Sequence, residues 1–305
     1  MNLLSIAEIH IVDKKKEGDA VDKEFVRNKY EEYFMSITRE TANSDLVYLY
    51  KGKKLPSGFE AYEIGQKSYS EIISPIISKY SDKYEWIKPV HRHIGDPSKE
   101  KRGLSFANNH IVKAYADKNA HRERILLMKL FAHSKLKNNF RDSIGEILDY
   151  EYPLKNDGNV EFGKVDLVSY RNGSIILIEG KTHRNPETLL RTILEIKTYS
   201  RLFPATPNEM TSDEHKDTDY FRKIFNEIIS DDARVSLKAI PIIVLECTSD
   251  GVRSESEEEF LQKRKYEETI ALAKITWGID VLRLIERKPY IPGEQYGEYS
   301  IDRIE

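Results

Sequence analysis

The chain has 305 residues, with 48 Lys and Arg against 51 Asp and Glu, so its net charge is −3. Hydrophobic residues make up 39%, too many for wholesale disorder, and the single cysteine, Cys247, excludes a disulfide scaffold and a cysteine-based zinc ribbon. No apolar run is long enough to span a bilayer, and the start of the chain lacks the basic segment of a signal peptide. We therefore expect a cytoplasmic protein that makes no membrane contact.

The first hundred residues predict mixed structure. Residues 3–12 and 45–55 have the composition of strands, whereas residues 59–84 favour a helix that Pro75 breaks or kinks. The polar stretch 91–103 contains an Asp-Pro turn signal and is the best candidate for a linker. We therefore divide the chain into an N-terminal α+β region (1–103) of unknown role and a second domain (104–305).

The clearest pattern begins after residue 120. Apolar residues at helical spacing predict a helix over 121–136. Alternation of polar and apolar residues predicts a half-buried strand over 146–154, and two more strands follow at 163–170 and 175–181. The "RNGS" segment between the last two predicts a tight turn. These features indicate a three-strand antiparallel meander whose last strand is apolar on both faces.

Helices and strands alternate in the rest of the chain. The predicted elements are a helix over 187–203 with Asn185 as N-cap, a helix over 220–232, a strand over 237–247, a helix over 254–278 that ends at Gly278, and a strand over 279–287. Strands separated by helices favour parallel pairing. The fold class expected is therefore α/β (α+β), a central mixed β-sheet flanked by helices.

The residues that could bind a metal or take part in catalysis lie in the meander. Asp166 is in the middle of its strand, and Glu179 and Lys181 end the next strand, after the tight turn. Residues i and i+2 of a strand face the same side, so Glu179 and Lys181 are expected to project together, close to Asp166. Carboxylate oxygens in a partly open site suit Mg²⁺ or Mn²⁺. A lysine beside them could orient or activate a water molecule.

The short pattern acid-x-Lys is not specific by itself. It recurs at Asp13, Glu195, Glu214 and Glu286, as expected in a chain in which 32% of the residues are charged. Glu286 also ends an apolar strand, but a helix precedes that strand, so no hairpin supplies a partner carboxylate. The combination of Asp166 with Glu179 and Lys181 across a hairpin is therefore the specific signal.

With these residues the chain resembles the PD-(D/E)xK nuclease superfamily, in the RecB-like variant of its motif. The order helix, three-strand meander, helix, strand from about residue 120 is similar to the restriction-endonuclease-like core of that superfamily, although Val165 replaces the proline of the motif. The resemblance implies that Asp166 and Glu179 bind the metal, with the carbonyl of Gly180 as an extra ligand. It also implies that Lys181 assists the attacking water in phosphodiester hydrolysis.

Three further residues extend the resemblance. RecB-like nucleases often carry a Gln and a Tyr four residues apart on the next helix, where this chain has Glu195 and Tyr199. An ordinary exposed Glu beside a core-flanking Tyr is an equal alternative. Glu123 continues the apolar stripe of the first helix, which suggests a third acidic metal ligand. Glu146 and Glu151 on the first strand are the reserve candidates.

The remaining candidates carry weaker signals. His91 and His93 indicate a solvated linker, His183 could touch a phosphate or face solvent, and Cys247 indicates a small buried hydrophobe. Basic groups outside the carboxylate cluster could line a phosphate track or be scattered solubilising charge; they are Lys14–Lys16, Lys51–Lys54, Lys99–Arg102, Lys135, Lys137 and Arg141.

The sequence thus predicts a nuclease that depends on Mg²⁺ or Mn²⁺ and hydrolyses DNA phosphodiester bonds. The alternative is a catalytically inactive member of the same fold that serves as a nucleic-acid or protein interaction module. Nucleic acid, as DNA, is the expected partner, and a homodimer is left open. The net charge of −3 argues only against non-specific coating of nucleic acid by the whole surface.

Overall fold

The structure is a computed structural model of the chain. It describes residues 23–51, 67–90, 104–116, 122–137, 143–155, 161–172, 174–182, 189–203, 236–246, 267–288, 290–295 and 297–303. The helical elements are α1 (Lys23–Ser36), α2 (Ala42–Lys51), α3 (Lys67–Lys79), the 3₁₀ helix η2 (Ser81–Trp86), α4 (Leu104–Ala116), α5 (Arg122–Lys137), α6 (Leu189–Leu202), α10 (Glu267–Ala271) and the π-helix η5 (Leu272–Thr276). The strands are β1 (Glu146–Lys155), β2 (Glu161–Arg171), β3 (Ser174–Thr182), β4 (Ser236–Glu246), β5 (Leu282–Lys288) and β6 (Glu298–Arg303).

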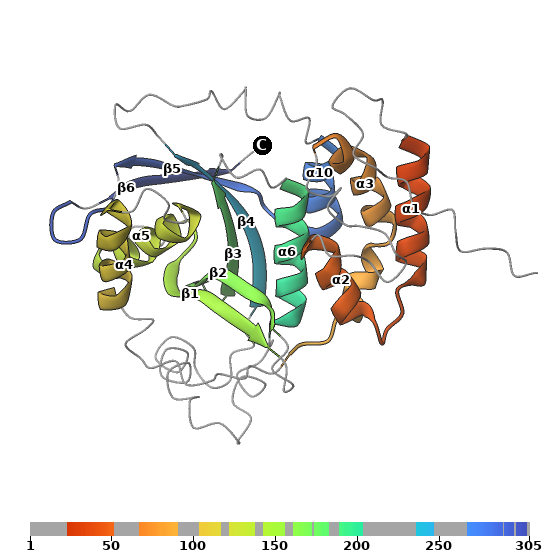
Figure 1. The fold of residues 1–305 in the computed structure, drawn as a ribbon, viewed down its shortest axis with the longest axis horizontal. Coiled ribbons are helices and arrows are strands. Elements are labelled where there is room, and N and C mark those ends of the chain that lie inside the picture. Colours follow the sequence, from red (N-terminus) through yellow and green to blue (C-terminus); the bar gives the residue numbers. More distant parts are fainter. Residues whose placement is uncertain are drawn as a thin grey trace, which may run out of the picture.

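The six strands form one mixed sheet in the order β1-β2-β3-β4-β5-β6 (Figure 1). Strands β1, β2 and β3 are an antiparallel meander, and Asn172 takes a positive φ of 50° in the turn between β2 and β3. Strand β4 is parallel to β3, and β5 is parallel to β4, because α6 lies in the first connection and α10 with η5 in the second. The predicted α/β class, meander and parallel pairing are therefore confirmed. The antiparallel strand β6 was not predicted.

Helices cover both faces of the sheet (Figure 1). On one face, α6 and the N-terminal helices share a hydrophobic cluster with Ile175 and Leu177 of β3. On the other face, α4 and α5 pack on Ile176 and Ile178 of the same strand. Successive residues of β3 thus enter opposite clusters, which explains why this strand is apolar from Ile175 to Ile178. None of the described helices is long and apolar enough to cross a membrane.

Strand β1 departs from its prediction as a half-buried strand. Both of its faces are covered, and Ile147 and Leu148 are each at most 1% exposed. Tyr150 and Tyr152 enter opposite clusters although they are two residues apart, and Glu151 between them has a positive φ of 47°. This irregularity breaks the simple alternation of a strand.

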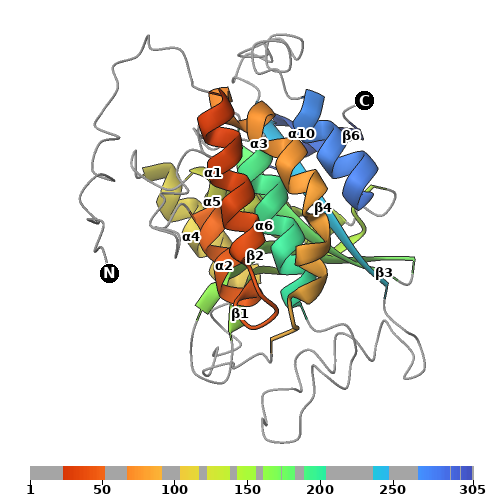
Figure 2. The ribbon, with the colours of Figure 1, turned by 90° about the vertical axis from the view of Figure 1, so that its right-hand side faces the viewer.

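The described part of the N-terminal region is helical. The strand predicted over 45–55 is wrong, because residues 42–51 form α2. The buried side chains of α2 include Ala42, Asp45, Leu46, Leu49 and Tyr50, which follow the i, i+3, i+4 spacing of a helix. The aromatic and β-branched composition of this segment favours a strand, but packing of its buried stripe against α6 stabilises a helix instead. In Figure 2, α1, α2 and α3 form a layer in front of α6.

Most other predicted elements are present. The helices predicted over 59–84, 121–136 and 187–203 correspond to α3, α5 and α6, and Pro75 lies inside α3. The last predicted helix is described from residue 267 and ends before Gly278, whose φ is 63°. The predicted strand over 3–12, the helix over 220–232, the Asn185 cap and the boundary near residue 103 lie outside the described residues.

Candidate active site

Asp166 and Glu179 lie on neighbouring strands at the same level of the sheet. In the ladder between β2 and β3, Leu167 is paired with Ile178, so the next residue along each strand is Asp166 or Glu179. The backbone N–H of Gly180 donates a 2.9 Å hydrogen bond to Oδ2 of Asp166. The hairpin therefore brings both carboxylates to one place.

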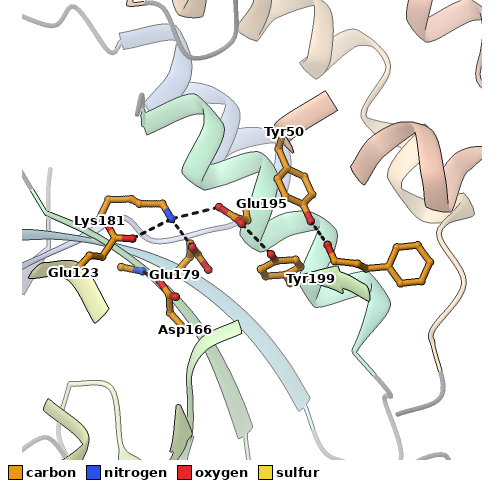
Figure 3. Close-up of polar contacts among 9 residues, drawn as sticks. Tyr50, Glu123, Asp166, Glu179, Lys181, Glu195 and Tyr199 are labelled. Carbon is orange, nitrogen blue, oxygen red and sulfur yellow. Dashed lines mark hydrogen bonds and ion pairs between the residues drawn. The ribbon is translucent and has the colours of Figure 1, made fainter. Parts of the chain in front are cut away.

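Lys181 lies at the centre of the cluster of acidic side chains (Figure 3). Its Nζ is 2.6 Å from Oε1 of Glu179, 3.5 Å from Oε2 of Glu195 and 3.6 Å from Oε1 of Glu123. Glu123 comes from the first turn of α5 and Glu195 from α6. The lysine at the end of β3 thus joins helices that pack on opposite faces of the sheet. We call Glu123, Asp166, Glu179, Lys181 and Glu195 the acidic cluster.

The sequence also singled out Tyr199, and it belongs to this site. Its hydroxyl donates a 2.9 Å hydrogen bond to Oε1 of Glu195, one helical turn away on α6. Tyr199 is buried, and Glu195 is largely enclosed. The alternative interpretation of Glu195 as an ordinary exposed side chain is therefore wrong.

Burial and mutual repulsion perturb the charges of the acidic cluster. Burial raises the pKa of Asp166 to about 7, although Lys181 and the N–H of Gly180 act in the opposite direction. Burial and the charge of Asp166 raise the pKa of Glu179 well above its ordinary value. Burial by itself would lower the pKa of Lys181, but the surrounding carboxylates raise it well above its ordinary value. The site therefore holds excess buried negative charge that one ammonium does not fully offset.

One carboxylate oxygen of the cluster has no hydrogen-bond partner among the residues that the structure describes. Glu179 is only 2% exposed, and its Oε2 has no hydrogen-bond partner in the described part of the chain. A buried carboxyl oxygen in this state is costly unless a donor or a cation meets it. The donors that converge here are hard oxygens, the kind that Mg²⁺ and Mn²⁺ prefer. The residues present therefore fit a divalent cation.

The side chains are not arranged as a finished metal site. Within the described ranges, no group of three or more His, Cys, Asp or Glu residues is positioned to hold a metal ion. The ammonium of Lys181 lies where the carboxylates of Glu123, Glu179 and Glu195 converge. A cation could bind only if these carboxylates turned from the ammonium toward the metal.

The reserve candidates do not make the contacts of the cluster. Oε1 of Glu146 is 3.4 Å from Nζ of Lys135, and Oε2 of Glu151 is 3.0 Å from the guanidinium of Arg124. Lys135 therefore pairs with an acid. His91, His93, His183 and Cys247 lie outside the described residues, as do Lys14–Lys16, Lys53, Lys54, Lys99–Arg102 and Arg141.

Sequence reasoning missed one residue at the site. Tyr50 of α2 packs edge-on against Tyr199, with ring centroids 5.7 Å apart and an interplanar angle of 83°. No motif or spacing connects these two residues, because they are separated by more than a hundred positions. The helical stripe of α2 could have indicated that Tyr50 is buried, but not against which partner.

Comparison of the chain with protein-family models, with curated proteins and with solved structures finds no match. The chemistry of the acidic cluster is therefore the basis for assigning a function.

Proposed function

We propose that the protein is a metal-dependent nuclease that hydrolyses DNA phosphodiester bonds, with a restriction-endonuclease-like core formed by α5, β1–β3, α6 and β4. The observation that carries the proposal is Oε2 of Glu179, a buried carboxylate oxygen without a hydrogen-bond partner among the described residues. It belongs to a group of carboxylates that meet beside a lysine, where the end of β3 lies next to the middle of β2. A purely structural ion pair would gain nothing from this orphaned oxygen.

Asp166 and Glu179 would hold Mg²⁺ or Mn²⁺, with the carbonyl of Gly180 and the carboxylate of Glu123 as further ligands. When bound, the metal would acidify a water molecule and stabilise the charge that develops on the phosphate. The N–H of Gly180 fixes Oδ2 of Asp166, which leaves the Oδ1 oxygen of that residue for a ligand. Binding requires both carboxylates to be ionised, so it would release the protons that the raised pKa values retain.

Lys181 would place and activate the nucleophile. If Glu179 and Glu123 bound a cation, the ammonium of Lys181 would be free to contact a water molecule and the phosphate. Oε2 of Glu195 would stay paired with Lys181, because Tyr199 fixes the Oε1 oxygen of Glu195 through a 2.9 Å hydrogen bond. Glu195 and Tyr199 are therefore supporting residues in this proposal, and neither contacts the scissile bond.

A second candidate is a catalytically inactive module with the same fold, which binds nucleic acid or protein. The position of Lys181 favours it, because the ammonium already pairs with carboxylates that a metal would need. In this case the cluster is a buried ion-pair network. Metal titration followed by thermal melting distinguishes the two candidates, because only a metal-binding protein gains stability from Mg²⁺ or Mn²⁺.

The decisive experiment is a cleavage assay with purified protein and Mn²⁺ or Mg²⁺ on circular and linear DNA, single-stranded and double-stranded, with RNA as a separate substrate. We expect metal-dependent cleavage of DNA, and cutting of circles would establish endonuclease action. Asp166→Ala, Glu179→Ala and Lys181→Met should each lower the rate by about 100-fold or more.

The chain offers a matched control for the lysine. Lys288 ends β5 in the same acid-x-Lys pattern, but its side chain is 65% exposed and pairs with Glu298 on the surface. Lys288→Met should therefore leave the cleavage rate within about twofold of the wild type. The nuclease proposal fails if cleavage is absent on every substrate, or if all three site variants keep wild-type rates.

A further inference from the structure

The N-terminal helical layer reaches the acidic cluster through one side chain. Tyr50 of α2 is 1% exposed and packs edge-on against Tyr199 of α6 (Figure 3). Its hydroxyl donates a 2.9 Å hydrogen bond to the backbone carbonyl of Phe162 on β2. This bond anchors the ring of Tyr50 to the sheet, so its position does not depend on α2 alone.

Tyr199 is confined on a second side by the backbone of β2. Gly163 follows Phe162 and has a φ of 154°, and a Cβ atom built there would overlap the hydroxyl oxygen of Tyr199. The hydroxyl therefore lies in a slot that only glycine leaves open. With Tyr50 against its ring and Gly163 against its hydroxyl, Tyr199 has little freedom to change rotamer.

A series of contacts leads from this slot to the lysine. Tyr199 donates to Oε1 of Glu195 over 2.9 Å, and Oε2 of Glu195 is 3.5 Å from Nζ of Lys181. Burial raises the pKa of both tyrosines, and the charge of Glu195 raises it further, which agrees with their closeness to this carboxylate. If Tyr199 moves, Glu195 loses the donor that orients it, and Lys181 loses one of the carboxylates that hold it.

We propose that Tyr50 is a positioning residue, which fixes Tyr199 and through it the Glu195 carboxylate that holds Lys181. The effect of Tyr50 on catalysis rests on the proposed function. The positioning of Tyr199 and Lys181 by Tyr50 does not depend on that function. It assigns a role to the N-terminal region, whose α2 completes the support of the site. We expect the ring to be responsible for this effect, because its contact with Tyr199 is the edge-on packing of the two rings.

The test compares substitutions that keep or remove this ring. Tyr50→Met keeps apolar volume without a ring, and we expect a loss in kcat of about tenfold with KM unchanged within about twofold. Tyr50→Phe keeps the ring and should remain within about threefold of the wild type. Tyr33→Phe is the matched control, because Tyr33 is an equally buried N-terminal tyrosine whose hydroxyl also donates to a backbone carbonyl, that of Asp45.

A double substitution separates positioning from general packing. If Tyr50 acts through the hydroxyl of Tyr199, then Tyr50→Met combined with Tyr199→Phe should be no slower than Tyr199→Phe alone. Losses that multiply would overturn the proposal. Gly163→Ala is a second variant that displaces the same hydroxyl from the other side, and it should reproduce the loss in kcat. It keeps the test valid if Tyr50→Met does not fold.

A measurement without catalysis separates failure of this inference from failure of the proposed function. The ammonium of Lys181 is enclosed by carboxylates, so its ¹⁵N-bound protons should exchange slowly and give an NMR signal. We expect Tyr50→Met and Gly163→Ala to broaden or remove this signal, and Tyr50→Phe and Tyr33→Phe to retain it. An unchanged signal in folded Tyr50→Met overturns the inference, whether or not the protein cleaves DNA.

Discussion

At the scale of the residue, the acidic cluster is a compromise between charge and burial. Burial opposes ionisation of both Asp166 and Glu179; the charge of Asp166 further raises the pKa of Glu179, and the charges of Glu195 and Glu123 further raise that of Asp166. Lys181 relieves this repulsion, and its own ammonium is stabilised by the same carboxylates. Such a group of charges costs folding free energy compared with an apolar core, which is typical of residues kept for function.

The raised pKa of Asp166 makes a prediction about stability and pH in metal-free protein. Its pKa is about 7 in the folded state, against 3.8 ordinarily, so between these values the folded state retains a proton that the unfolded state has released. The free energy of unfolding should therefore fall as the pH rises from about 4 to 7, by at most about 4 kcal/mol from this group. Below pH 4 the effect is absent, and above pH 7 it is complete.

Urea unfolding across this pH range, with a chelator present, measures the effect. Asp166→Asn should flatten the dependence, because the amide does not titrate. Asp82→Asn, on η2 and outside the acidic cluster, should keep the wild-type slope. If Asp166→Asn shows the same slope as the wild type, Asp166 does not retain its proton in the folded state.

At the scale of the element, the packing of α3 on α10 connects two helices that are far apart in the sequence. Glu71 of α3 accepts hydrogen bonds from the backbone N–H groups of Glu268 (2.8 Å) and Thr269 (3.4 Å), at the start of α10. The hydroxyl of Thr269 also donates to Glu71, over 2.8 Å. Glu71 thus caps a helix that is nearly two hundred residues away, where the first N–H groups lack partners within the helix.

Removal of this cap should be measurable. We expect Glu71→Ala to lower the free energy of unfolding by about 1–2 kcal/mol, because charge-assisted hydrogen bonds to α10 are lost. Glu31→Ala is the control, since Glu31 makes a solvent-exposed ion pair with Lys79 and should cost less than about 0.5 kcal/mol. Equal destabilisation of both variants in thermal or chemical unfolding would show that the cap contributes nothing.

At the scale of the whole molecule, the helices of the N-terminal region belong to the same core as the sheet. Tyr30 and Phe34 of α1 and Leu49 of α2 share one hydrophobic cluster with Val165 of β2 and Leu194 of α6. The backbone N–H of Val90 also donates to the carbonyl of Leu202, at the end of α6. These helices therefore cover one face of the sheet.

This shared core predicts how a truncated chain behaves. A protein that starts at residue 104 would expose the apolar side of α6 and one sheet face to water, so we expect it to lose cooperative unfolding and to bind hydrophobic dyes. Calorimetry and dye fluorescence, compared with the full chain, measure this. A sharp unfolding transition in the truncated protein would show instead that residues 104–305 fold independently.

Local sequence patterns were sufficient for the central part of the protein. The turn between β2 and β3, the apolar run of β3 and the stripe of α5 each identify their element, because the signal extends over a few residues only. The same range of sequence contains Asp166, Glu179 and Lys181, so their convergence followed from strand geometry. Glu195 and Tyr199 were singled out through the resemblance to RecB-like nucleases, whereas local spacing alone left an ordinary exposed glutamate as an equal alternative.

What the sequence by itself determined is therefore local: the meander, the alternation of strands with helices, and the acidic residues of β2 and β3. Tertiary structure decided that residues 42–51 are helical, that β1 is covered on both faces, and that Tyr50 and Gly163 confine Tyr199. The physical reason is that these features depend on side chains that meet from distant parts of the chain. Burial against such a partner outweighs local propensity, which amounts to only about 1 kcal/mol per residue.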